Sequence, residues 1–189
     1  MKSGKLPCYV VLLLITLAAG LVLGGTYSLT KDAIDRQQEQ KQEAARLSVL
    51  PEAQRFEQCE APEGLDWLYE GLNGDASAGY AAQITTNGFG GEIEIVVGID
   101  KAGTVTGISV GGSNFSETAG LGAKSKEPEF AAQFKGLIAP LTVVKAGEDK
   151  PANGIDAITS ATITSKAVTN AVNRACELIA AVPAAEPQN

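Results

Sequence analysis

Histidine is absent from this chain of 189 residues, and cysteine is scarce. Without histidine the chain cannot build a Ser-His-Asp or Cys-His catalytic arrangement, and most zinc sites lose their usual ligands. The three cysteines, Cys8, Cys59 and Cys176, stand at no metal-ligand spacing, so we predict no metal site. The sequence leaves open whether Cys59 and Cys176 form a disulfide.

Basic residues and aromatics are also few. Lysine and arginine number 15 against 22 acidic residues, which gives a net charge of -7 and an isoelectric point near 4.7. Nucleic acid is therefore an unsuitable partner, because its phosphate backbone selects basic surfaces. Aromatic residues make up only 5% of the chain, so we expect a core of Val, Ile, Leu and Ala.

The sequence does contain one long apolar run. No charged residue occurs from Tyr9 to Leu29, a length sufficient to cross a bilayer as a helix. Lys2 and Lys5 precede the run, so the positive-inside rule predicts a cytoplasmic N-terminus and an extracytoplasmic remainder. The rival interpretation is a cleaved signal peptide, but the run exceeds the usual length of such a segment. We therefore expect a single-pass protein of the cell membrane.

The soluble part begins with polar sequence. Residues 31–48 are rich in charge and in helix formers, and predict a solvated helix that Pro51 ends. Residues 60–79 predict irregular structure. From Tyr80 onward, alternating apolar residues between turn signals predict an antiparallel meander of about three strands.

Helices and a further strand follow the meander. Phe130, Phe134 and Leu137 recur at helical spacing after Pro128, and residues 141–147 predict a strand. The last helix is predicted from about Ser165 to Val182, on an apolar stripe. The stripe comprises Val168, Val172, Ala175, Leu178, Ile179 and Val182.

This order of elements predicts an α+β fold, an antiparallel sheet with packed helices preceded by one transmembrane helix. We divide the chain into a transmembrane anchor (1–30), an extracytoplasmic helical connector with the segment that leads into the domain (31–74), a folded domain (75–183) and a disordered tail (184–189).

Five hydroxyl side chains crowd the seven residues from Thr159 to Ser165, just before the last predicted helix. Capping a helix needs one such oxygen, which Thr164 or Ser165 would supply, so most of the cluster needs another explanation. A helix N-terminus also offers unpaired N–H groups and a positive dipole end, which together suit a phosphate.

The residues of this cluster carry a resemblance. The segment Asp156-Ala157-Ile158-Thr159-Ser160-Ala161-Thr162 resembles the flavinylation motif of the FMN-binding domain family. In that family the final threonine carries FMN through a phosphoester bond, which a Mg-dependent flavin transferase installs from FAD. The resemblance implies Thr162 as the attachment site, with Asp156 as motif support and Thr159, Ser160 and Ala161 beside the cofactor. Ala157 and Ser160 stand where the family usually has glycine, which matters at Ser160 if that position needs a positive φ.

A second segment strengthens the resemblance. Residues 116–122, Ser-Glu-Thr-Ala-Gly-Leu-Gly, are similar to a family loop that lines the flavin ring, with Ala119 in place of proline. The resemblance implies that Glu117, Thr118, Leu121 and Gly122 contact the cofactor, although turn chemistry explains Glu117 and Thr118 equally well. The turn at 88–91 also resembles a family turn.

The layout as a whole resembles the G subunits of Rnf ion-translocating ferredoxin:NAD oxidoreductase complexes. The resemblance implies an electron-carrying flavoprotein subunit with covalent FMN, which works with other membrane subunits and meets a flavin transferase during maturation. The flavin would be the reactive group, so the chain would not be catalytic alone.

Three alternatives stay open. The domain is shared with the C subunits of Na+-translocating NADH:quinone reductases and would also suit a stand-alone exported flavin reductase. A non-redox exported module is the third, because Ala119, Ala157 and Ser160 depart from the family pattern.

Overall fold

The computed structural model describes residues 7–145 and 147–182. Lys2 and Lys5, on which the predicted orientation depends, and the predicted disordered tail lie outside the described residues. The chain divides into two compact units, residues 1–43 and residues 44–189. The elements are α1 (Cys8–Val49), β1 (Arg55–Cys59), β2 (Trp67–Asn73), β3 (Ala76–Asn87), β4 (Glu92–Ile99), β5 (Val105–Gly111), a 3-10 helix η1 (Gly122–Lys126), α2 (Pro128–Ala132), β6 (Thr142–Val144), β7 (Gly154–Asp156) and α3 (Thr162–Ala180).

The first unit is helical. The two helices predicted at 9–29 and 31–48 are parts of one continuous helix, α1, of 42 residues. Its apolar part is long and apolar enough to cross a membrane, and the side chains of that part are exposed. The helix ends at Val49, two residues before Pro51, because a residue that precedes proline disfavours the helical conformation.

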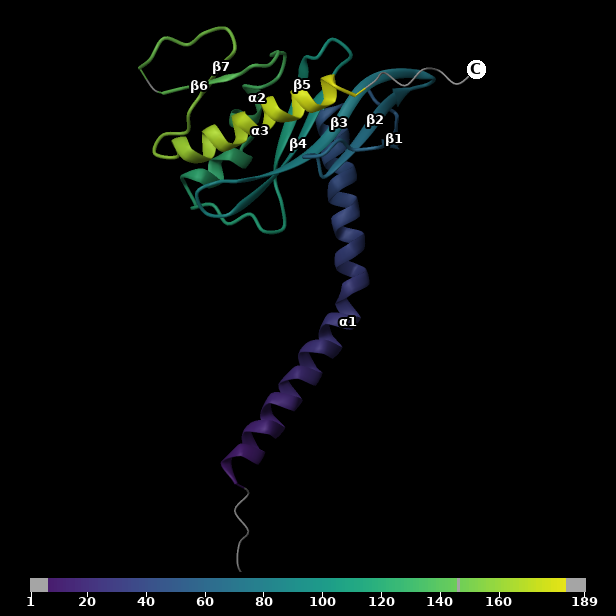
Figure 1. The fold of residues 1–189 in the computed structure, drawn as a ribbon, viewed down its shortest axis with the longest axis vertical. Helices are drawn as coiled ribbons and strands as arrows, with labels where there is room; N and C mark the ends of the chain where they lie inside the picture. The colour runs from purple at the N-terminus through teal and green to yellow at the C-terminus, as the bar shows by residue number, and fades with distance from the viewer. Residues whose placement is uncertain (1–6, 146, 183–189) are drawn as a thin grey trace, which may run out of the picture. The chain divides into compact units, whose positions relative to one another are not determined.

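The second unit contains an antiparallel sheet of five strands in the order β1-β2-β3-β4-β5, which confirms the predicted α+β class (Figure 1). The meander is larger than predicted, and the prediction of irregular structure over 60–79 is wrong. β2 and the start of β3 occupy most of that range. The predicted domain boundary at residue 75 falls between these two strands. The edge strand β1, Arg-Phe-Glu-Gln-Cys, lacks the apolar alternation that would have indicated it.

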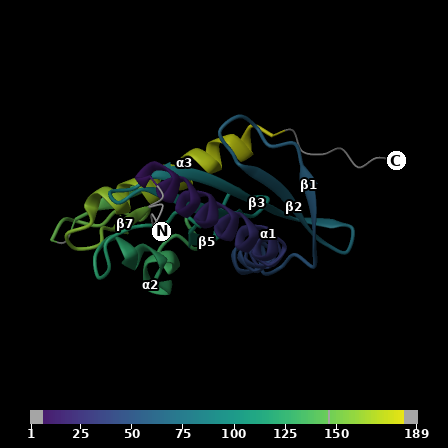
Figure 2. The same ribbon diagram turned by 90° about the horizontal axis from the view of Figure 1, so that it is seen from below.

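One face of the sheet packs against α3, which lies along β3 and β4 (Figure 2). The alternating residues Ile93, Ile95, Val97 and Ile99 are buried there, as predicted. The α3 stripe meets them with Val168, Val172, Ala175 and Ile179. Each of the valine and isoleucine side chains contributes about 1.5–3 kcal/mol when it leaves water, so this core holds α3 firmly on the sheet.

The predicted helix after Pro128 is shorter than its spacing suggested. α2 covers only five residues, and Phe134 lies beyond its end although the side chain is fully buried. Apolar residues spaced three and four apart can thus be buried in a core from irregular backbone as well as from a helix.

The other face of the sheet holds the residues that follow the first unit. Val49 lies against Gly98, where an added Cβ would stand 2.2 Å from the Val49 carbonyl oxygen. The Thr106 hydroxyl donates a hydrogen bond to the same carbonyl. The Arg46 guanidinium lies 4.3 Å from the centre of the Tyr69 ring, a cation–π contact. These contacts fix residues 45–50 on the sheet.

Candidate functional site

The two segments singled out in the sequence meet at the start of α3. They line one cavity of about 380 Å³. Seven of the predicted site residues lie in its wall: Glu117, Thr118, Leu121, Gly122, Ser160, Ala161 and Thr162. Phe89, Ile163 and Thr164 complete the lining. The volume falls within the range of small-molecule sites, which is about 300–1,000 Å³.

The N-terminus of α3 forms one wall of this cavity. The helix begins at Thr162, three residues earlier than predicted, and its N-cap residue is Ala161. The prediction that Thr164 or Ser165 caps the helix is therefore wrong, and the N-cap makes no side-chain hydrogen bond. The first helical N–H to find its partner belongs to Ser165, which donates to the Ala161 carbonyl at 3.0 Å. The N–H groups of Thr162 and its two successors thus stand at the positive end of the helix dipole.

Ser165 supports the segment that leads into the helix. Its hydroxyl accepts a hydrogen bond from the Ile158 N–H at 2.9 Å and donates one to the Ala161 carbonyl at 3.0 Å. Because Ser165 is fully buried, these two bonds hold the backbone before Thr162 in place. The Thr162 side chain itself is half-buried and lies in the cavity wall.

Ser160 has a left-handed backbone conformation, with φ at 63°. It is the only residue other than glycine with a positive φ among those the structure describes. Glycine is usual at this position of the flavinylation motif, and Ser160 has the positive φ that glycine favours. A side chain in this region costs roughly 1–2 kcal/mol, a strain that glycine would avoid.

The opposite wall is the loop that holds Glu117, Thr118 and Leu121. The Thr118 carbonyl accepts hydrogen bonds from the N–H groups of Leu121 and Ala123, each at 3.1 Å, which closes a tight turn. Leu121 is 39% exposed and faces the cavity as an apolar surface. Both oxygens of the Glu117 carboxylate bond to other parts of the wall.

Sequence reasoning did not assign two apolar residues of the wall. Phe89 is 71% exposed and Ile163 is 59% exposed. Together with Leu121 they give the cavity a partly apolar rim. The available signal was the position of Phe89 between glycines at the tip of a hairpin, where a large apolar side chain has no core to enter.

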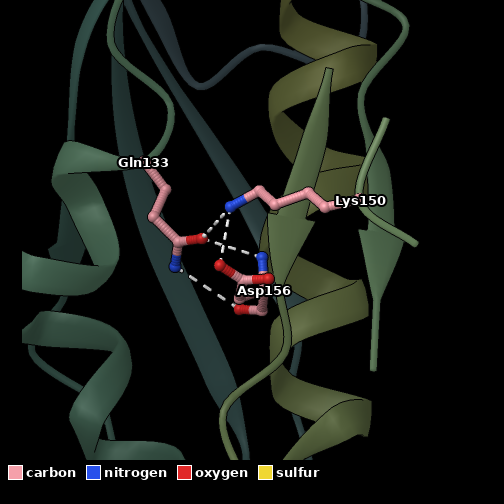
Figure 3. Close-up of polar contacts among 3 residues, drawn as sticks. All are labelled: Gln133, Lys150 and Asp156. Carbon is pink, nitrogen blue, oxygen red and sulfur yellow. Dashed lines mark hydrogen bonds and ion pairs between the residues drawn. The ribbon is translucent and has the colours of Figure 1, made fainter. Parts of the chain in front are cut away.

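Asp156 and Thr159 do not line the cavity. Asp156, the last residue of β7, joins Lys150 and Gln133 in a polar cluster (Figure 3). Its carboxylate pairs with the Lys150 ammonium at 2.6 Å, and its N–H donates to the Gln133 side-chain oxygen at 2.8 Å. Lys150 donates to the same oxygen at 3.2 Å. The cluster therefore ties β7, which precedes the hydroxyl-rich segment, to the end of α2.

A second and larger cavity, of about 630 Å³, lies near the C-terminal half of α3. Tyr80, Asp100, Cys176 and Glu177 are among its lining residues. Cys59 and Cys176 are both free thiols, so the disulfide that the sequence left open is not formed. Burial raises the pKa of the Cys176 thiol to about 11, which keeps it protonated at neutral pH. A thiol that stays protonated is unreactive, because the thiolate is the nucleophile.

Comparison with known proteins shows what the chain resembles. Residues 88–177 match the FMN-binding domain family. The chain is 36% identical to the G subunit of the Na+-translocating ferredoxin:NAD+ oxidoreductase complex of Acetobacterium woodii, over 89% of this chain and 88% of that protein. It is 33% identical to the G subunit of the proton-translocating ferredoxin:NAD+ oxidoreductase complex of Clostridium ljungdahlii, over 85% of this chain and 84% of that protein.

A solved structure supports the fold. The crystal structure of NqrC from Shewanella oneidensis superposes with a TM-score of 0.50 and 20% sequence identity, over 65% of each chain. At this identity the similarity supports the α+β fold alone.

Proposed function

Because the chain belongs to the family of G subunits of ion-translocating ferredoxin:NAD+ oxidoreductase complexes, we propose that it is an electron-carrying flavoprotein subunit of such a complex. The cofactor is FMN, as the family match indicates. We propose further that Thr162 carries it through a phosphoester bond. The observation that supports this most is the position of Thr162, the first residue of α3, in the wall of the cavity that the Glu117–Gly122 loop completes.

The residues of the cavity suit the two chemically different parts of FMN. The phosphate needs hydrogen-bond donors and a positive field, and the uncapped start of α3 offers both. The isoalloxazine ring needs apolar surface, which Leu121, Ile163 and Phe89 expose around the same cavity. Ala161, whose side chain is a single methyl group, would let a ligand approach the backbone closely.

Attachment is a phosphoryl-group transfer that needs FAD and a flavin transferase. The Thr162 oxygen would replace AMP on the phosphorus of the FMN half of FAD: a new oxygen–phosphorus bond forms, the bond between the two phosphates breaks, AMP leaves and the hydroxyl loses its proton. The remaining negative charge of the phosphoester would lie at the N-terminus of α3, where the dipole stabilises it by about 0.3–1 kcal/mol.

FMN, once bound, supplies the redox chemistry, and the chain supplies attachment, orientation and electrostatics. A covalent bond would retain the cofactor outside the cell, where free FMN is dilute. We propose that α1 crosses the membrane with its N-terminus in the cytoplasm and places the FMN domain on the extracytoplasmic side. Electrons would then pass between this subunit and the other membrane subunits of the complex.

Removal of the Thr162 hydroxyl tests the proposal. The wild type and Thr162→Val are produced together with a flavin transferase, and the denatured protein bands are viewed under ultraviolet light. Flavin fluorescence is expected in the wild type and its complete loss in Thr162→Val. Thr142→Val, at an exposed threonine of β6 away from the cavity, is the matched control and should stay fluorescent. A dark wild-type band, or a fluorescent Thr162→Val band, would overturn the proposal.

A further inference from the structure

Glu117 is hydrogen-bonded to two other segments around the cavity. One carboxylate oxygen accepts hydrogen bonds from the N–H groups of Phe89 at 2.6 Å and Gly90 at 3.0 Å. The other oxygen accepts one from the Thr164 hydroxyl at 3.1 Å. The partners lie 28, 27 and 47 residues away in sequence. One side chain therefore links the β3–β4 turn, its own loop and the first turn of α3.

Two glycines leave the space that this carboxylate occupies. A Cβ added at Gly88 would stand 2.1 Å from one Glu117 oxygen, and a Cβ added at Gly122 would stand 2.0 Å from the other. Neither glycine has a positive φ, so their backbones do not require glycine. The requirement is room for the carboxylate, which lies between the two glycines.

The turn at the far end of this connection has little else to hold it. The Phe89 ring is mostly exposed, so its side chain does not fix the turn in a core. The remaining ties are a hydrogen bond from Gly88 N–H to the Gly91 carbonyl and one from the Ser116 hydroxyl to the Gly90 carbonyl. Hydrogen bonds to a charged group are stronger than neutral ones, so Glu117 makes the main contribution.

From these contacts we infer that Glu117 is the positioning residue of the flavin site. Its carboxylate holds Phe89 and the start of α3 at their places in the cavity wall, and thereby presents Thr162 for attachment. The presentation of Thr162 for attachment rests on the proposed function. The positioning of the turn and of α3 does not, because the hydrogen bonds themselves need no cofactor. In this role Glu117 assembles the site, beyond a contact with the flavin.

The first test uses the full chain in detergent, made without a flavin transferase. Hydrogen exchange is measured at the amides of Phe89 and Gly90, with the amides of Ile95 and Val97 in the core strand β4 as internal reference. Glu117→Ala is expected to speed exchange at the turn about tenfold, the loss of a hydrogen bond to a charged group, with β4 unchanged. Glu92→Gln, at a neighbouring exposed carboxylate bonded to Asn114, is the control and should leave both regions unchanged.

The second test is rescue by a conservative variant. Glutamine keeps an oxygen for the two N–H groups, and its amide can donate to the Thr164 oxygen. With a flavin transferase present, Glu117→Ala is expected to lower FMN incorporation severalfold. Glu117→Gln is expected to restore slow hydrogen exchange at the turn and most of the FMN incorporation. Unchanged exchange in Glu117→Ala, or a Glu117→Gln variant that behaves like it, would overturn the inference.

Two further results keep the test decisive. If Glu117→Ala fails to fold, Thr164→Val removes one of the three bonds and should lower FMN incorporation severalfold while β4 stays protected; unchanged incorporation would count against the inference. If the wild type carries no FMN but exchange at the turn responds as described, the proposed function is wrong and the positioning role stands.

Discussion

The two cavities at opposite ends of α3 differ in the property that decides what they can bind. The larger one, at the C-terminal half, has Asp100, Lys101 and Glu177 in its lining. The smaller one lies at the N-terminus, where the N–H groups of the first turn point outward and the dipole is positive. The helix dipole therefore stabilises a phosphate at the N-terminus of α3 and disfavours one at its C-terminus, which is the negative end. The proposed FMN site is thus the smaller of the two cavities.

The largest contrast is expected between two glycines, one from each cavity. Gly122→Ala should remove most FMN incorporation, because its Cβ would displace the Glu117 carboxylate. Gly103→Ala, in the larger cavity, meets no neighbouring atom but forces a side chain into a left-handed conformation at φ 82°. We expect it to cost about 1 kcal/mol of stability with FMN incorporation intact. Intact-protein mass and thermal unfolding measure the two effects. Equal FMN incorporation in both variants would erase the distinction between the cavities.

A smaller effect is expected at Ser160, the strained residue beside Thr162. Ser160→Gly should stabilise the protein by about 0.5–1 kcal/mol, because glycine adopts the positive φ without strain but gains more freedom in the unfolded chain. Ser160→Ala keeps the strain and serves as the control. Thermal unfolding of the full chain in detergent provides the measurement. A Ser160→Gly variant no more stable than Ser160→Ala would show that the site carries no strain.

The smallest effect tests the polarity of α3 directly. In protein without FMN, Ile163→Asp should be more stable than Ile163→Asn, whereas Ala180→Asp should be less stable than Ala180→Asn. Each difference should be about 0.3–1 kcal/mol and shrink in high salt, because the added charge meets opposite ends of the helix dipole. Both positions are exposed, so packing changes little. Differences of the same sign at both ends would refute the electrostatic contrast between the cavities.

Local patterns were enough to predict much of this protein. The uncharged run from Tyr9 to Leu29, the alternation in β4 and the stripe on α3 each carry a period or a length that few other structures would produce. Residues 160–162 of the first motif and Glu117, Thr118, Leu121 and Gly122 of the second line one cavity, whereas Asp156 and Thr159 do not.

The features that escaped prediction depend on contacts between distant residues or on missing local signals. The start of α3 was placed too late because Ala161, its N-cap, is not a capping residue. The edge strand β1 has no alternation and takes its conformation from pairing with β2. The connection from Glu117 to Phe89 and Thr164 joins residues up to 47 positions apart, so no window of sequence contains it.

The central claim is that Thr162, at the N-terminus of α3, carries FMN. The most direct measurement is the intact mass of the mature wild-type protein from a host with a flavin transferase, followed by peptide mapping. We predict a mass increase equal to FMN less one water, located on Thr162 within the peptide that contains the start of α3. An unmodified mass, or an adduct on Thr159, Thr164 or another residue, would contradict the claim.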